Sequence, residues 1–104
     1  MTINFINIRQ WAEDKNIHHP EGVHRQFVKL AEEQGELAQS ILKGDMEGIQ
    51  DGIGDCVVVL TILAQQHGLK IEDCIQSVWD IISKRTGKTV DGVFVKDAPA
   101  GGAE

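Results

Sequence analysis

The fold is decided by the stretch PEGVHRQFVKLAEEQGELAQSILK (residues 20–43), which predicts one long amphipathic helix. Proline is tolerated at the first helical position, so Pro20 marks the start, and Gly44 marks the end. The apolar residues recur in steps of three, four and seven, which is typical of a helix that covers a core. These residues are Val23, Phe27, Leu30, Leu37 and Ile41. Glu33 lies beside this apolar stripe and Glu36 lies further round the helix.

Three more helices are predicted, over about residues 4–15, 45–67 and 71–84. Asp45 is a natural N-cap for the third of the four helices. Its second half, Cys56 to Ala64, is apolar all round and is therefore expected at the centre of the core. Glycines recur every fourth residue at positions 44, 48 and 52, which indicates close contact between helices.

Four helices with short links predict an all-α fold, an antiparallel four-helix bundle-like protomer with an irregular C-terminal tail. We expect a single domain over residues 1–96, in which 88–96 are extended or looped. Residues 97–104 are expected to be a disordered tail.

Composition restricts the class of function. The chain has 104 residues and a formal net charge of −6, which argues against duplex nucleic acid as the main partner. The start lacks a signal-peptide pattern, and the longest apolar stretch is far too short to span a bilayer, so no membrane association is expected. Cys56 and Cys74 lack metal-ligand spacing, and buried, reduced thiols of a cytoplasmic protein are the interpretation we favour over a disulfide.

Two pairs of carboxylates stand out: Glu33 with Glu36, and Asp51 with Asp55. Spacings of three and four place each pair on one side of its helix, where like charges repel. Solvated surface charge is the simpler interpretation, but Glu33 and Asp55 adjoin residues that must be buried, where an unpaired carboxylate protonates or finds a cation. All-oxygen ligands suit Mg²⁺, or Mn²⁺ as the alternative, and the helical setting excludes an EF-hand.

Since Mg²⁺ commonly bridges to phosphates, we expect a phosphate ester or anhydride as substrate. Lys84, Arg85 and Lys88 are candidate phosphate contacts, against a simpler role as helix-end cations. The Gly-Lys-Thr at 87–89 is not a P-loop, because Ile82 stands where that motif needs glycine. Trp11 is a candidate for stacking on a base, although core packing is the commoner role of such an aromatic residue.

On these residues the chain resembles the MazG-like all-α nucleoside triphosphate pyrophosphohydrolases. The resemblance rests on Lys29-Leu30-Ala31-Glu32-Glu33-Gln34-Gly35-Glu36-Leu37, similar to the family's Glu-Glu-x-x-Glu stretch, and on Asp51-Gly52-Ile53-Gly54-Asp55. The family usually carries an acid three residues before the aspartate, where this chain has Gly52. Asp51, one residue earlier, is acidic and is the candidate that replaces it.

The resemblance implies hydrolysis of a (d)NTP to the monophosphate and pyrophosphate, a nucleotide-pool housekeeping reaction. It implies that Glu33, Glu36, Asp51 and Asp55 hold Mg²⁺ and that Glu32 or Glu36 serves as the catalytic base. It also implies a homodimer or homotetramer. A narrower dUTPase or dCTPase is an enzyme alternative, and a noncatalytic helical interaction module is the alternative from another class.

Overall fold

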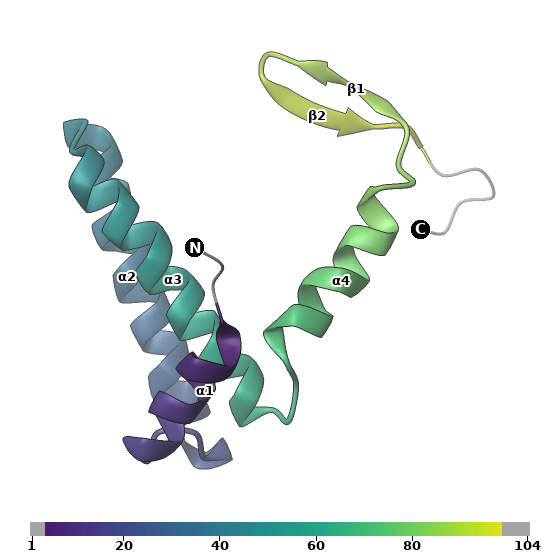
Figure 1. Cartoon of the computed structure of the whole chain (residues 1–104). Helices are drawn as coiled ribbons and strands as arrows, with labels where there is room; N and C mark the ends of the chain where they lie inside the picture. The colour runs from purple at the N-terminus through teal and green to yellow at the C-terminus, as the bar shows by residue number, and fades with distance from the viewer. Residues whose placement is uncertain (1–3, 99–104) are drawn as a thin grey trace. The chain divides into compact units, whose positions relative to one another are not determined.

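The computed structural model describes residues 4–98, whose contacts divide them into two units, residues up to Asp73 and residues from Cys74 onward. The helices and strands are labelled in Figure 1. The first unit holds α1 (Phe5–Asp14), a 3₁₀ helix η1 (Pro20–Gly22), α2 (Val23–Lys43) and α3 (Met46–Gln66). The helix α4 (Ile71–Ile82) begins at the end of the first unit, and the second unit also holds β1 (Gly87–Val90) and β2 (Val93–Lys96).

The four predicted α-helices are present at the expected places, so the mostly helical fold class is confirmed. Pro20 opens the short η1 turn, and α2 itself starts at Val23. A single domain over residues 1–96 and closure of all four helices into a bundle stay predictions. Residues 99–104 of the predicted disordered tail lie outside the described residues. Among the described helices, none is both long and apolar enough to cross a membrane.

The helices α2 and α3 form an antiparallel hairpin, seen side by side in Figure 1. Gly44 ends α2 with a φ of 69°, a left-handed conformation that glycine adopts without steric cost. Asp45 then caps α3, because its side chain accepts a hydrogen bond from the Gly48 N–H at 3.1 Å. A Cβ at Gly52 would lie 3.0 Å from the Leu37 Cβ, so the missing side chain lets the two helices approach closely. The predicted glycine contact is thus confirmed at position 52.

The C-terminal half of α3 packs against α1. Ala12 of α1 is fully buried, and Ile62 of α3 is 2% exposed. The Gln65 side chain donates a hydrogen bond to the Arg9 carbonyl at 3.1 Å. Arg9 also forms a two-bond ion pair with Glu72, at 2.6 and 2.8 Å. This hydrogen bonding lowers the pKa of Glu72 from 4.5 to about 2 and fastens the start of α4 to α1.

The buried core is smaller than the apolar stripes predict. Val59, Thr61 and Ile62 are buried, as expected for the central apolar segment, but Leu60 is exposed. In α2, Phe27 and Ile41 of the predicted stripe are more than half exposed, so their prediction as core residues is wrong for the described unit. The physical reason is that a helix period identifies an apolar side, whereas a two-helix hairpin covers only part of that side.

Residues 88–96, predicted as extended or looped, form an antiparallel β-hairpin, so their extended backbone is confirmed, whereas the irregular C-terminal tail of the predicted fold class is wrong here. Asp91 and Gly92 both have positive φ, 51° and 79°, as the two central residues of a tight hairpin turn require. Gly87 pairs with Lys96, and a Cβ at Gly87 would press on the backbone of Val95 and Lys96, so the close approach of the two strands requires glycine here. An Asp-Gly pair between apolar runs was the sequence signal for this hairpin.

Candidate functional site

The acidic residues of α2 lie along one side of the helix, next to its contact with α3. Glu33 is 7% exposed, whereas Glu32 and Glu36 are exposed. At about 100° per residue, Glu33 is turned about 40° from Leu37, the residue that touches α3, and Glu36 is turned about 100°. The three carboxylates therefore run from the helix contact outward onto the surface.

The acidic residues of α3 have a matching position. Gly52 is buried against Leu37, and Asp51 and Asp55 are exposed. Around the helix axis, Asp51 is turned about 100° and Asp55 about 60° from Gly52, in nearly the same direction as the buried Ile62 further along α3. Any larger residue at position 52 would press on Leu37, because its Cβ would lie 3.0 Å from the Leu37 Cβ.

Both sets of acids lie on the same face of the hairpin. Viewed from the N-terminus of its own helix, each set lies anticlockwise of the contact between Leu37 and Gly52. In two antiparallel helices, the same sense of rotation from the contact leads to the same side of the pair. The opposite face is apolar and exposed, with Phe27 and Leu42 on α2 and Ile53 on α3. We call the first side the acid face, defined by Glu32, Glu33, Glu36, Asp51 and Asp55.

These acids also lie at similar heights along the hairpin. Counting in opposite directions from the contact between Leu37 and Gly52, Asp55 comes level with Gln34 and Asp51 with Ala38. With a rise of 1.5 Å per residue, the backbone positions 33, 36, 51 and 55 therefore span about 8 Å of the hairpin. The arrangement brings the four predicted metal ligands to one region of one face.

Glu33 is the carboxylate of the acid face with one buried oxygen that has no partner among the described residues. Its Oε1 lies 3.3 Å from the Nζ of Lys29, one turn earlier on α2, and the Lys29 side chain is more than half exposed. Its Oε2 is buried and has no hydrogen-bond partner among the described residues. A buried, unpartnered carboxylate oxygen is unfavourable, and a hard cation is the kind of group that would satisfy it.

The side chains of the acid face are not gathered into a complete coordination sphere. Among residues 4–98, no three acidic, histidine or cysteine side chains form a group that could hold a metal ion. Mg²⁺ commonly keeps several waters and takes only one or two carboxylates together with substrate phosphates. The donor set therefore suits Mg²⁺ bound with a phosphate ligand, and rotation of the exposed carboxylates of Glu36, Asp51 and Asp55 would add to it.

The predicted substrate contacts are divided between the two units. Trp11 belongs to α1 in the same unit as the acid face, and its side chain is about half exposed. Lys84 and Arg85 follow α4, and Lys88 lies in β1. These three basic residues are exposed and belong to the second unit.

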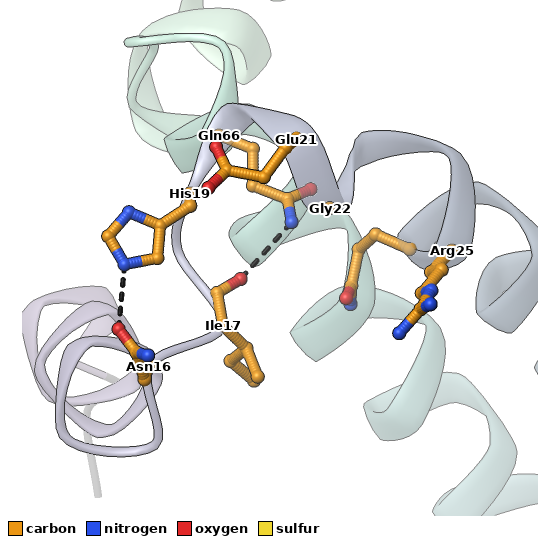
Figure 2. A pocket seen from close by; sticks show the side chains of 8 residues that line it. Asn16, Ile17, His19, Glu21, Gly22, Arg25 and Gln66 are labelled. Carbon is orange, nitrogen blue, oxygen red and sulfur yellow. Dashed lines mark hydrogen bonds between the residues drawn. The ribbon is translucent and has the colours of Figure 1, made fainter.

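A pocket of about 300 Å³, which we did not predict from the sequence, lies where the chain enters α2 (Figure 2). Its lining residues come from the link between α1 and α2, the first turn of α2 and the end of α3. They are Asn16, Ile17, His19, Glu21, Gly22, Arg25, Gln26 and Gln66. The available sequence signal was Gln66, a polar residue at the end of the apolar run of α3.

Comparison with known proteins gave one family and one curated relative. Residues 23–90 match the model described as the MazG nucleotide pyrophosphohydrolase domain. Over 61 residues the chain is 49% identical to the "Uncharacterized 18.2 kDa protein in rep-hol intergenic region" of Haemophilus phage HP1 (strain HP1c1). That alignment covers 59% of this chain and 37% of the phage protein, so the chain spans well under half of that relative. No solved structure matches.

Proposed function

We propose, because this chain belongs to the MazG nucleotide pyrophosphohydrolase domain family, that it hydrolyses nucleoside triphosphates to monophosphates and pyrophosphate with Mg²⁺. The observation that carries the proposal is the buried, unpartnered Oε2 of Glu33 on a face that also holds Asp55 at nearly the same height. A solvated acidic surface would leave its carboxylates in water, whereas this one turns a carboxylate toward the helix contact.

In this proposal Glu33, Glu36, Asp51 and Asp55 hold the metal, with Mn²⁺ as an alternative to Mg²⁺. When bound, the metal ion polarises the phosphoryl oxygens and offsets the negative charge of the triphosphate. Asp51 takes the place of the acid that the family usually carries at position 52, where a Cβ would lie 3.0 Å from the Leu37 Cβ.

The remaining carboxylate of the acid face acts on water. Glu32 is exposed and lies one residue before Glu33, and its side chain has no hydrogen bond or ion pair to a described residue. It is therefore available to orient a water molecule or to take its proton, a role for which Glu36 is the second candidate. Trp11, Lys84, Arg85 and Lys88 stay predicted substrate contacts.

We also propose that the working form is a homodimer or homotetramer. The apolar face of the hairpin supports this proposal, because Phe27 is 62% exposed and Leu42 is 87% exposed. Large apolar side chains gathered on one exposed face commonly mark an interaction surface. Sedimentation equilibrium of the full chain measures the oligomeric state directly.

The test of the enzymatic proposal is a panel of NTPs and dNTPs with Mg²⁺ and identification of the products. We expect pyrophosphate and the nucleoside monophosphate, which distinguishes cleavage between the α and β phosphates from release of orthophosphate. Glu33→Gln should abolish turnover, whereas Glu13→Gln, on an exposed residue of α1, should leave it unchanged. Absence of pyrophosphate with every nucleotide and either metal would contradict the proposal and favour a binding module.

A further inference from the structure

The pocket at the start of α2 lies at one end of the acid face. Arg25 precedes Glu32 by seven residues and therefore points in nearly the same direction, about 10 Å further along α2. On α3, Gln66 follows Asp55 by eleven residues, again on nearly the same line and about 16 Å further along. These separations are comparable to the length of an extended nucleoside triphosphate. Phosphates held at the acid face would thus place a base near the pocket.

The pocket presents one fixed hydrogen-bond acceptor. Gln66 is 4% exposed, and its Nε2 donates to the Ile17 carbonyl at 3.1 Å (Figure 2). Its Oε1 is buried and has no partner among the described residues. Gly22 leaves room for this amide, since a Cβ there would lie 3.0 Å from the Gln66 Nε2. Because the amide nitrogen is already engaged, the group that binds Gln66 must be a donor.

The rim of the pocket supplies a donor and a second acceptor. Arg25 and Glu21 are exposed and, among the described residues, form no ion pair with each other or with a third residue. His19 is held by Asn16 through a contact of 2.6 Å between the His19 Nε2 and the Asn16 Oδ1. An orphan acceptor in the wall and an unpaired guanidinium on the rim fit a planar ligand that carries both a donor and an acceptor.

We infer that this pocket binds the nucleobase of the substrate, with the Gln66 Oε1 accepting an N–H of the base and Arg25 donating to a ring nitrogen or carbonyl. The inference rests on the proposed function for the identity of the ligand, but the pocket and the orphan acceptor are independent of it. A phosphate fits less well, because it offers no donor to the Gln66 Oε1 and would face the Glu21 carboxylate.

The kinetic test compares a nucleoside triphosphate with inorganic triphosphate, which has no base. Arg25→Ala should raise KM for the nucleotide by at least about tenfold, as expected for loss of a hydrogen bond from a charged donor. KM for inorganic triphosphate, or its inhibition constant if it is not hydrolysed, should change less than about twofold. Lys43→Ala, on an exposed cation at the far end of α2, is the matched control and should affect neither.

The binding test uses nucleosides without phosphate or metal. Addition of nucleoside should shift the NMR signals of the Gln66 side-chain amide, and Gln66→Met, which removes the acceptor at similar length, should weaken the binding. If Gln66→Met does not fold, Arg25→Ala and the nucleoside titration of the unmodified chain still decide.

The outcomes separate the two proposals. Suppose that the chain hydrolyses nucleotides, that Arg25→Ala changes KM equally or not at all for the two triphosphates, and that nucleoside does not shift the Gln66 signals. This result would overturn the proposed base pocket and leave the enzymatic function standing. A shift at Gln66 in a chain that hydrolyses no nucleotide would support the pocket and overturn the function.

Discussion

Neutralising Glu33 should remove activity and at the same time stabilise the fold. Glu33→Gln keeps the shape of the side chain and removes a charge whose Oε2 is buried without a partner. An unsatisfied buried group costs about 1–3 kcal/mol, and more when it is charged, so replacing the carboxylate by a neutral amide recovers the part of the cost that is due to the charge. The ion pair with Lys29, whose side chain is more than half exposed, contributes only about 0.3–0.5 kcal/mol. The net expectation is a gain of about 1 kcal/mol, or about 4–8 °C in Tm.

The assay is thermal unfolding of the full chain with and without Mg²⁺ plus a nonhydrolysable nucleotide. At one hundred times its dissociation constant, the ligand should stabilise the unmodified chain by about 2.7 kcal/mol, and this gain should be absent in Glu33→Gln. Glu32→Gln, on the exposed neighbour, should change the ligand-free stability by less than about 0.5 kcal/mol. A Glu33→Gln variant that is less stable than the unmodified chain, yet gains as much from the ligand, would refute the reasoning.

Three further predictions concern the hairpin, the link to α4 and the acid face. Gly54→Ala should raise the free energy of unfolding by about 1 kcal/mol, because open space surrounds Gly54. Gly52→Ala should be about 1–3 kcal/mol less stable than Gly54→Ala, because the added methyl group would press on Leu37. Urea unfolding of both variants measures the difference, and equal midpoints would contradict the prediction. The pKa of Glu72 is lowered from 4.5 to about 2, so the stability from its pair with Arg9 is present above pH 4.5 and is lost as the pH falls toward 2. When the unfolding midpoint is plotted against pH, Glu72→Gln should therefore show a smaller decrease between pH 4.5 and pH 2 than the unmodified chain. Parallel curves for the two proteins would argue against the pair. Asp55→Asn should abolish pyrophosphate release while the far-ultraviolet circular dichroism spectrum stays unchanged, and full activity in this variant would exclude Asp55 as a ligand.

The order of helices and the acid face could be predicted from the sequence because both follow from the 3.6-residue period. That period places Asp55 in line with Ile62, and the structure shows that this line is buried further along α3. The close approach of the two helices at Gly52 was also predictable, because glycine disfavours a helix and its recurrence every fourth residue on one side indicates that another helix packs there.

The exposure of Phe27 could not be predicted, because periodicity shows that a side is apolar but not what lies against it. The pocket around Gln66 depends on a bond to the Ile17 carbonyl from forty-nine positions away, a pairing that no local pattern indicates. The β-hairpin was not predicted for another reason: its strands are only four residues long and carry a weak pattern. The stronger signal for a hairpin was the turn at Asp91 and Gly92, whose positive φ angles a tight hairpin turn requires.

The glycines of α3 have a consequence for how the acid face moves. Gly48, Gly52 and Gly54 all fall in the first nine residues of a helix whose later turns contain none. Each lowers the intrinsic propensity of that segment by about 1 kcal/mol relative to alanine. The turns that carry Asp51 and Asp55 should therefore open transiently far more often than the valine-rich turns beyond them, and their amide protons should exchange faster with deuterated solvent. Such flexibility would let Asp51 and Asp55 adjust around the proposed Mg²⁺, and addition of Mg²⁺ should then slow the exchange.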